Sequence, residues 1–464
     1  MKDIKEFRLD LNLNSSKNIL RVKEAVDKFS NQKPMVNLNI ELSKVLGISD
    51  IVILKKAKQI IYKTFNYRKK NPKFEINFNL FDSIKYFLFF FIFILFRKNI
   101  NVKNEERIKI DIILDNVEKI YVVEKFQKFL SFFNSSLIIT DKKLSSEKKA
   151  NLKNSSYINE HFSFISNNLL KGKRLSLIKF VFNLIFTSLK YKVNLLRIYF
   201  PIFYTSLKYH KIFNIYESKF LIFDRIYHTC PMRNYFFKKY GGKKIFCLQS
   251  HLAEGTISLF SDIDTLVTFG KEKDTRKKLR LLGGKINETF CSGSMRMEHS
   301  LENLDDVDKI DDIDILIIGL NPYFWLNTSN KIPKIYYEQM KWLAEISKKY
   351  PKLKIIYKHH TTFKGDPIEK KIFEPTTIKT IIHPEKKLNS YHFLIKSKLI
   401  VSFGSTMILE ALSLGKHCYF LDPNLENCAF FNELDYLRNI RIESFEKLEK
   451  IISELLNEKN NQSN

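Results

Sequence analysis

Three groups of polar residues in the C-terminal half of the chain each follow a predicted strand, and their types suit a phosphate group. They are Gly404-Ser405-Thr406, Lys358-His359-His360 and His383-Pro384. The carboxyl ends of parallel strands meet at one edge of a sheet, so we expect the three groups to line one pocket. Backbone N–H groups and hydroxyls that open a helix can hold a phosphate. Lysine and histidine can offset the negative charge of a leaving phosphate.

The first of these groups joins a predicted strand to a predicted helix. The apolar run Leu399–Phe403 predicts a buried strand, Ser405 or Thr406 can cap the helix that follows, and Gly415 can end it. We therefore expect free backbone N–H groups at this turn, aimed beyond the end of the strand. Glu410 comes four residues after Thr406, on the same side of the helix, so it could face a ribose.

The histidines of these groups also have a structural interpretation. A single histidine near a strand end is more often a hydrogen-bonded structural residue, and His383 before Pro384 is as readily a turn residue as a ligand. The adjacent pair His359-His360 after Lys358 favours function. No Asp-x-Asp motif follows a predicted strand in this half, so the sequence predicts no divalent metal site.

Polar residues also follow two predicted strands in the first half. His251 and Glu254 come after the strand Ile245–Leu248, and either could take a proton from an acceptor hydroxyl. A solvated loop is the alternative for both. The predicted strand Phe220–Phe223 is followed by three further candidates, which are Asp224, Arg225 and His228.

The composition fits a globular protein with two main domains. The 464 residues are 44% hydrophobic and 28% charged, with a formal net charge of +28. Such a charge suggests an anionic partner, either a membrane surface or nucleic acid. Base composition is an alternative cause, because Lys, Asn, Ile and Phe are abundant while Gly and Pro are scarce. The five cysteines lack metal-ligand spacing, which predicts neither a zinc site nor a disulfide framework and favours the cytoplasm.

Two apolar segments raise the question of a membrane. Tyr86–Phe96 is uninterrupted by polar residues, but as a helix it would rise only about 16 Å, too little to cross a bilayer. Leu175–Tyr209 mixes aromatic and aliphatic residues with basic ones, as do amphipathic helices that lie on anionic lipid. Core packing is the alternative for each segment. Together with the net charge, they predict peripheral association with the inner face of the cytoplasmic membrane.

Strands alternate with helices in two series, which predicts an α/β fold with parallel sheets covered by helices on both faces. We expect a basic helical region at 1–100, a first Rossmann-like domain at 101–300 with a helical insertion at about 165–215, and a second at 301–464, facing each other across a cleft. The pattern also predicts a helix over Asp50–Thr64 and a strand over Ser136–Thr140. A nucleic-acid partner is disfavoured, because the aromatic residues lie in apolar runs rather than among exposed basic residues.

Several short motifs lie together between residues 240 and 425. They are the Lys-His-His group at 358–360, Ser390-Tyr391, the run Val401–Lys416, Phe269-Gly270 and Ser292–Arg296. This set resembles GT-B glycosyltransferase-like proteins, in particular those of bacterial surface-carbohydrate and capsular-polysaccharide synthesis. The resemblance implies two Rossmann-like domains, a nucleotide-sugar that binds the second domain as substrate, and no cofactor.

The resemblance also implies an activity and roles for the candidate residues. The enzyme would move a sugar from the nucleotide to a glycan or glycolipid acceptor. The Gly-Ser-Thr turn would hold the donor phosphate, and Glu410 would bind its ribose. The Lys-His-His group, together with His383, would stabilise charge on the leaving group. The base would be His251 or Glu254.

Other activities share this architecture and stay open. UDP-N-acetylglucosamine 2-epimerases typically have a double-glycine turn with paired glutamates, where this chain has one glycine and Glu410. CDP-glycerol phosphotransferases use similar His and Ser contacts. CMP-sugar transferases show a His-Pro and a Ser-Ser/Thr motif, with which His383-Pro384 and Ser405-Thr406 are compatible, although Lys358-His359-His360 stands at the strand end where the His-Pro motif is expected. Their acidic-Gly motif is matched loosely by Glu254-Gly255. A scaffold without catalytic activity is a further alternative.

Overall fold

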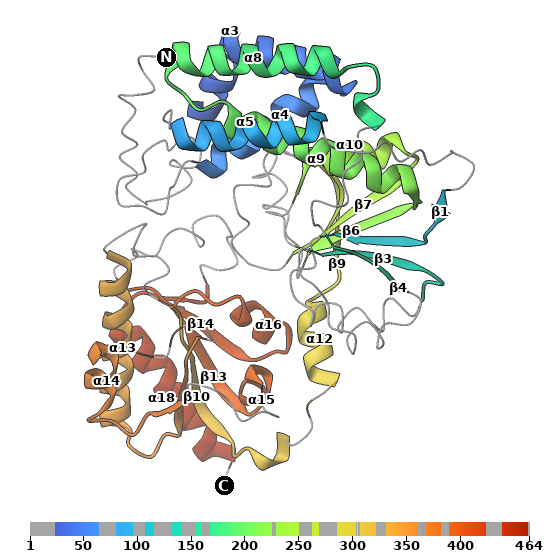
Figure 1. Cartoon of the computed structure of the whole chain (residues 1–464). Coiled ribbons are helices and arrows are strands. Elements are labelled where there is room, and N and C mark those ends of the chain that lie inside the picture. The colour runs from blue at the N-terminus through green and yellow to red at the C-terminus, as the bar shows by residue number, and fades with distance from the viewer. Residues whose placement is uncertain are drawn as a thin grey trace. The chain divides into compact units, whose positions relative to one another are not determined.

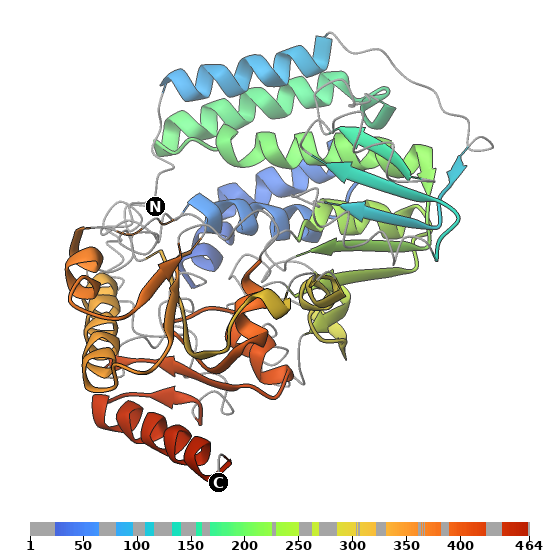
Figure 2. The ribbon, with the colours of Figure 1, turned by 90° about the horizontal axis from the view of Figure 1, so that it is seen from below.

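The computed structural model describes residues 24–64, 80–95, 107–115, 132–140, 155–159, 168–224, 229–249, 262–268, 285–302, 304, 307–321, 331–360, 363, 365, 367–381, 389–423 and 439–462. The chain forms two compact units, and among the described residues the first ends at Ser292 and the second begins at Gly293 (Figures 1 and 2). Each unit is built on its own parallel sheet.

The sheet of the first unit has seven strands in the order β4-β3-β2-β6-β7-β8-β9, and all neighbours are parallel. This is the Rossmann order, in which the first strand lies beside the fourth. The strands are β2 (Ile112–Asp115), β3 (Ser136–Thr140), β4 (Ser155–Asn159), β6 (Phe220–Asp224), β7 (Lys244–Leu248), β8 (Asp262–Thr268) and β9 (Lys285–Cys291). A separate pair joins β1 (Ile108–Lys109) to β5 (Tyr216–Glu217).

A group of helices belongs to the same unit. They are α3 (Lys33–Leu46), α4 (Asp50–Thr64), α5 (Leu80–Leu95), α8 (Arg174–Tyr191), α9 (Leu196–Ile215) and α10 (Pro231–Lys239), with a 3₁₀ turn η3 (Asn168–Leu170). The helix α9 is the centre of this group, since it contacts α4, α5, α8 and α10 (Figure 1). Thirteen of its residues are buried, so α9 is a core helix.

A buried ion pair fixes α10 to the sheet at the carboxyl ends of β2 and β6. Arg233 Nη1 donates to Asp115 Oδ2 at 2.8 Å, and both side chains are fully buried. Tyr209 of α9 donates to the same oxygen at 3.0 Å. Burial opposes ionisation of Asp115, but Arg233 and Lys208 hold its pKa below the ordinary value. The carboxylate is therefore charged at neutral pH.

The sheet of the second unit has six parallel strands in the order β12-β11-β10-β13-β14-β15, which is again the Rossmann order. The strands are β10 (Ile313–Ile318), β11 (Ile355–Lys358), β12 (Lys379–Ile381), β13 (Ser397–Ser402), β14 (His417–Leu421) and β15 (Arg441–Ile442). The helices are α12 (Met295–Glu302), α13 (Lys331–Lys349), α14 (Pro367–Phe373), α15 (Ser390–Ile395), α16 (Met407–Ser413) and α18 (Phe445–Gln462), with a 3₁₀ turn η6 (Val307–Lys309).

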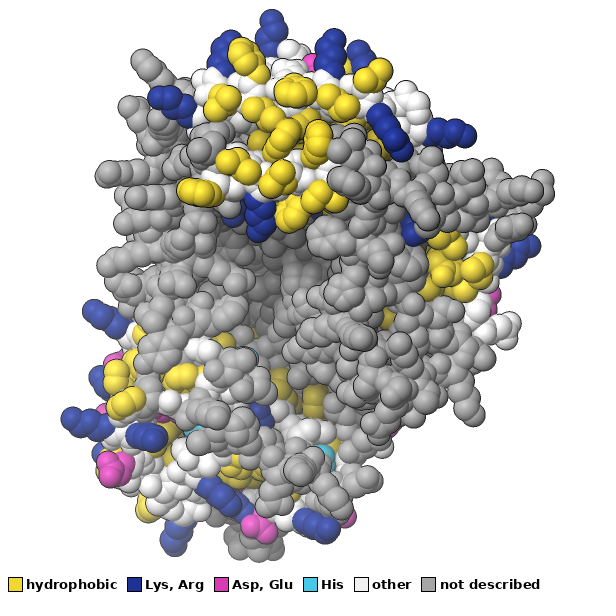
Figure 3. All heavy atoms as spheres, in the orientation of Figure 1, with side chains coloured by type: hydrophobic (Ala, Val, Ile, Leu, Met, Phe, Trp, Pro, Cys, Tyr) yellow, Lys and Arg dark blue, Asp and Glu magenta, His cyan; other side chains and the backbone are white. Residues whose placement is uncertain are grey.

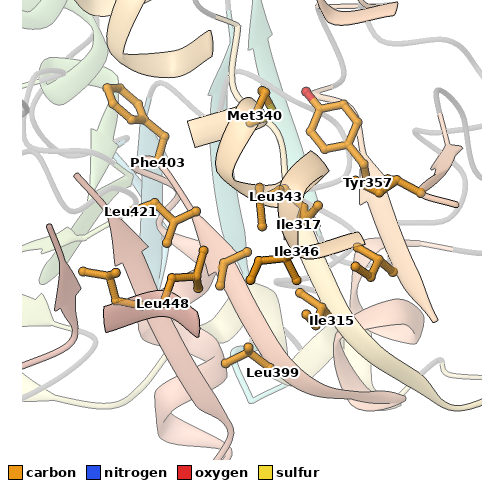
Figure 4. Close-up of a cluster of buried hydrophobic side chains, with 14 of the residues drawn as sticks. Ile315, Ile317, Met340, Leu343, Ile346, Tyr357, Leu399, Phe403, Leu421 and Leu448 are labelled. Carbon is orange, nitrogen blue, oxygen red and sulfur yellow. The ribbon is translucent and has the colours of Figure 1, made fainter. Parts of the chain in front are cut away.

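One hydrophobic cluster of the second unit lies on one face of its sheet. Alternate residues of β10, β11 and β13 point to this face and pack against Met340 and Leu343 of α13 and Leu448 of α18 (Figure 4). Tyr357 and Phe403, at the carboxyl ends of their strands, complete the cluster. The core therefore fixes the strand ends from which the candidate residues project.

The predicted α/β class with two Rossmann-like parallel sheets and a helical N-terminal region is confirmed. The polar composition of residues 141–160 predicts a loop, and this prediction was wrong in part, because residues 155–159 form β4, which pairs along its length with β3. The apolar and basic segment Leu175–Tyr209 falls in two helices, α8 and α9, because Lys192 ends α8 in the left-handed conformation with φ 54°.

Candidate functional site

The sheet of the second unit has its topological switch point between β10 and β13. The chain runs from β10 to β11 and β12 on one side, then returns to β13 and continues on the other side. Connections that leave two adjacent strands in opposite directions open a crevice beyond their carboxyl ends, where ligands of α/β proteins bind. Gly319 follows β10 at this point, and Gly404, Ser405 and Thr406 follow Phe403 after β13. This edge of the sheet is the candidate site.

The strand register lines up the residues at this edge. Ile318 of β10 pairs with Lys358 on one side and with Ser402 on the other. Strand spacing then separates Lys358 from Ser402 by roughly 10 Å between backbones. Ser402 Oγ donates to the carbonyl oxygen of Ile318 at 3.0 Å, which ties the ends of β10 and β13 together.

The turn after β13 has its amides turned inward. The backbone N–H of Gly404 and of Ser405 donate to Ser402 Oγ at 3.4 and 3.2 Å, and the N–H of Met407 donates to Ser405 Oγ at 3.3 Å. The expectation of free N–H groups at the turn was therefore wrong for Gly404 and Ser405.

Gly319 permits a close approach at the switch point. A Cβ atom at this position would lie 2.6 Å from the Tyr357 hydroxyl oxygen and 2.9 Å from the carbonyl oxygen of Lys358. The backbone N–H of Gly319 donates to that same carbonyl at 2.8 Å. A side chain here would therefore separate β10 from β11.

His359 lies in a buried polar cluster beyond β11. Its Nδ1 is 3.3 Å from Glu369 Oε1 of α14, and both side chains are almost fully buried. Its ring meets the edge of Tyr357 at a centroid distance of 4.5 Å, and the Tyr357 hydroxyl hydrogen-bonds to Tyr336. Gly365, with φ +84°, lies against the ring, since a Cβ there would be 3.0 Å from His359 Cε1. Glu369 and Gly365 thus lie directly against the imidazole.

Burial decides the protonation states in this cluster. Burial and the neighbouring Lys358 ammonium lower the pKa of His359 to about 4, so the imidazole is neutral at pH 7. Burial, Tyr336 and Glu369 raise the pKa of Tyr357 well above 10, so its phenol stays protonated. A neutral imidazole can accept a hydrogen bond or a proton through one nitrogen and donate a hydrogen bond through the other.

Lys358 and His359 lie on opposite faces of the sheet edge. Successive side chains of a strand alternate, and His359 shares the face of Tyr357, whereas Lys358 shares that of Ile318 and Ser402. Lys358 is buried, and its Nζ donates to the carbonyl oxygen of His359 at 3.3 Å. His360 is exposed. The Lys-His-His group therefore supplies one cation to the face of Ser402 and one imidazole to the face of Glu369.

Glu410 is held inside the second unit rather than exposed. Its Oε1 accepts from Ser294 Oγ at 2.5 Å, and its Oε2 accepts from the Tyr391 hydroxyl at 2.8 Å. Ser294 Oγ also accepts from the N–H of Met297 in the first turn of α12. Glu410 thus joins α12, α15 and α16, and a ribose contact stays a prediction.

The remaining candidates lie outside the described residues. These are His251, Glu254, Arg225, His228 and His383, together with the side chain of Asp224. Sequence reasoning missed Glu369, Gly319 and Ser402. The first gave no signal, because it lies in a helix of lysines and apolar residues, whereas the other two sit at predicted strand ends. Within the part of the chain that the structure describes, no group of three or more His, Cys, Asp or Glu residues could hold a metal ion.

No family model matches the chain, and no curated protein does. Among solved structures it is similar to the UDP-GlcNAc 2-epimerase of Methanocaldococcus jannaschii in complex with UDP-GlcNAc and UDP, with 16% identity over 75% of this chain and 93% of that one, at a TM-score of 0.41. It is also similar to the UDP-GlcNAc 2-epimerase of Neisseria meningitidis bound to UDP-GlcNAc, with 10% identity over 75% of this chain and 92% of that one, at a TM-score of 0.44.

The E. coli heptosyltransferase with ADP-2-deoxy-2-fluoro heptose is a third similar structure. It has 10% identity over 74% of this chain and 99% of that one, at a TM-score of 0.33. With identities and TM-scores this low, the three similarities add nothing to the strand order already described.

Proposed function

We propose that this protein is a glycosyltransferase that binds a nucleotide-sugar at the carboxyl edge of its second sheet and transfers the sugar to a glycan or glycolipid acceptor. The acceptor that we propose belongs to a bacterial surface polysaccharide such as a capsule or lipopolysaccharide. The single observation that carries the proposal is the switch point between β10 and β13, because it gathers small, hydroxyl-bearing and basic residues at one strand edge.

The residues at this edge divide into a phosphate side and a proton side. Gly404, Ser405 and Thr406 are half-buried beyond the end of β13, where Ser402 shares a register row with Ile318 and Lys358. In our proposal the donor diphosphate lies against this turn, and Lys358 offsets charge as the nucleotide leaves. Ser402 Oγ would then exchange its bonds with the Gly404 and Ser405 amides for bonds to the phosphate.

His359 supplies the second part of the proposal. A neutral imidazole next to Glu369 can donate a hydrogen bond through its N–H to an oxygen of the leaving phosphate. In this arrangement Glu369 acts through His359 and is a positioning residue. His251 or Glu254 stays our proposal for the base that deprotonates the acceptor.

Thermal unfolding with UDP, CDP, GDP or CMP tests the donor site. One nucleotide at about a hundredfold its Kd should add about 2.7 kcal/mol of stability and raise Tm. Gly404→Ala is the most informative variant. Nothing lies within 4 Å of an added Cβ, so the methyl group should leave the free protein unchanged. We expect the same Tm as the wild type without ligand and a smaller shift with nucleotide.

An exposed lysine in the same unit serves as the control. Lys341→Ala should keep the full nucleotide shift, since Lys341 lies on the solvent side of α13. A wild-type Tm that none of the four nucleotides changes would contradict the proposal. Incubation with the matching nucleotide-sugar separates the activities: a 2-epimerase interconverts the sugar without an acceptor, whereas a transferase releases nucleotide only when one is present.

A further inference from the structure

The helix α5 has two apolar faces, of which one packs on α9 and the other is exposed. On the inner face Phe89 and Phe90 pack against Phe200 of α9, with ring centroids 5.5 and 5.2 Å apart, and Phe90 also meets Phe203. The outer face follows the spacing of one helical stripe and consists of exposed side chains, which are Phe81, Ile84, Lys85, Leu88, Phe91 and Ile92.

The helix α8 repeats this arrangement. Its inner face is buried, and Phe180 meets Tyr199 of α9 edge to face at 5.8 Å. Its outer face holds Phe182 and Phe186, which are 62% and 67% exposed, in line with Leu175 and Leu189. Because α5 and α8 contact each other, their outer faces form one apolar surface, which we call the α5–α8 face (Figure 3). An exposed apolar surface of this kind marks an interaction site.

The margins of the α5–α8 face are basic. Residues 171–192 contain six Lys or Arg and no Asp or Glu. Exposed basic side chains lie along the apolar stripe and at its ends, and in Figure 3 they border the apolar side chains. They are Lys85, Arg174, Lys179 and Lys190. The partner must therefore be apolar in its interior and negative at its surface.

Two copies of this face would bring their basic margins together, so self-association is disfavoured by repulsion between like charges. A bilayer of anionic lipid matches this face, because its acyl chains suit the apolar side chains and its negative headgroups suit the basic margins. None of the described helices is both long enough and apolar enough to cross a membrane. We propose that α5 and α8 lie in the plane of an anionic membrane, with their outer phenylalanines and leucines inserted at the boundary between headgroups and acyl chains.

Co-sedimentation of the full chain with vesicles tests this surface independently of the donor site, because no nucleotide is needed. We expect binding to vesicles of phosphatidylcholine with phosphatidylglycerol, and much weaker binding to phosphatidylcholine alone. The double variant Phe182→Ser, Phe186→Ser should weaken partitioning by about tenfold or more. The double variant should have a Tm close to that of the wild type in thermal unfolding, since both side chains already face water.

Phenylalanines outside the face provide a matched control. Phe132 and Phe290 are 79% and 61% exposed in the same unit, and their double change to Ser should leave partitioning unchanged. The charge reversal Lys179→Glu, Lys190→Glu should abolish most binding at low salt, whereas the exposed pair Lys341→Glu, Lys450→Glu of the second unit should not.

Three results would overturn the proposal. The wild type could fail to sediment with anionic vesicles, or the Phe182/Phe186 double variant could bind them as the wild type does. Sedimentation velocity could also show a dimer that the double variant dissolves, and then a second copy of the chain covers the face. If the serine variant fails to fold, vesicle binding by the Lys179→Glu, Lys190→Glu variant tests the proposal by itself, because this variant changes only exposed side chains.

Discussion

Ser294 donates a hydrogen bond to Glu410 across 116 residues of sequence, with 2.5 Å between Ser294 Oγ and Glu410 Oε1. Together with Tyr391, this bond leaves both carboxylate oxygens of a buried glutamate satisfied. The contact joins the beginning of the second unit to the helix that follows the Gly-Ser-Thr turn. Glu410 therefore has a structural role whether or not it also meets a ligand.

Changing Ser294 to Ala should destabilise the second unit. The buried Glu410 oxygen loses a donor, and the first turn of α12 loses its cap, so we expect a loss of about 1–3 kcal/mol in the free energy of unfolding. Urea unfolding measures this loss. Lys341→Ala is the control, because Lys341 is exposed and pairs with Glu338 of its own helix α13. Equal stabilities of the two variants would contradict the structural role.

Changing Glu410 to Gln separates that role from a ribose contact. If the carboxylate only holds Ser294 and Tyr391, the variant should lose stability but bind nucleotide with the wild-type Kd. If it also binds the ribose, the Kd should rise by roughly tenfold, as expected for the loss of a hydrogen bond to a charged group. Calorimetric titration of the folded variant with the nucleotide identified by thermal shift gives this Kd.

The stability of the protein should rise with pH between about 4 and 6.5. In the folded chain the pKa of His359 lies near 4, whereas the ordinary value is 6.5, so in this window the unfolded chain binds more protons. Burial and Lys239 lower the pKa of His210 to about 4 as well, and it contributes the same slope. His359→Gln should remove up to about 3 kcal/mol of this dependence.

The matched variant is His210→Gln, which should remove a similar part of the slope and leave nucleotide binding unaltered. Denaturant unfolding at a series of pH values measures both. If Glu369 instead keeps His359 protonated in the folded chain, stability would fall as the pH rises through the pKa of His359. The variant His359→Gln would then remove that fall. Such a result would contradict a neutral imidazole at the site.

Gly319→Ala should be far more costly than Gly404→Ala. At position 319 the added methyl group meets the Tyr357 hydroxyl and a backbone carbonyl, and we expect a loss of about 1–3 kcal/mol from forced movement of packed groups. At position 404 there is open space. Thermal unfolding compares the two directly, and equal Tm values would show that β10 and β11 do not approach as described.

Asp115→Asn should strongly destabilise the first unit. It leaves the guanidinium of Arg233 buried without its counter-charge, and the expected loss is about 3–5 kcal/mol in urea unfolding. Glu338→Gln, which breaks the exposed pair with Lys341, should cost less than about 1 kcal/mol. A small effect of Asp115→Asn would mean that water reaches the pair.

Local patterns in the sequence predicted the elements themselves. The helix over Asp50–Thr64 and the strand over Ser136–Thr140 have the bounds that periodicity and β-branched content indicate. The strand, Gly-Ser-Thr turn and helix after β13 were also predicted, because Gly404 and the apolar run before it act over a few residues. From these elements the alternation of strands and helices gave the two parallel sheets.

Only the tertiary structure decided which residues meet. The Rossmann order, the contact of His359 with Glu369 and the bond of Ser294 to Glu410 depend on how distant strands and helices pack, which no local pattern records. The same holds for the outer faces of α5 and α8. A phenylalanine follows the same helical spacing whether it packs on α9 or faces water, so the sequence showed an apolar helix, and only packing decided which side stays exposed.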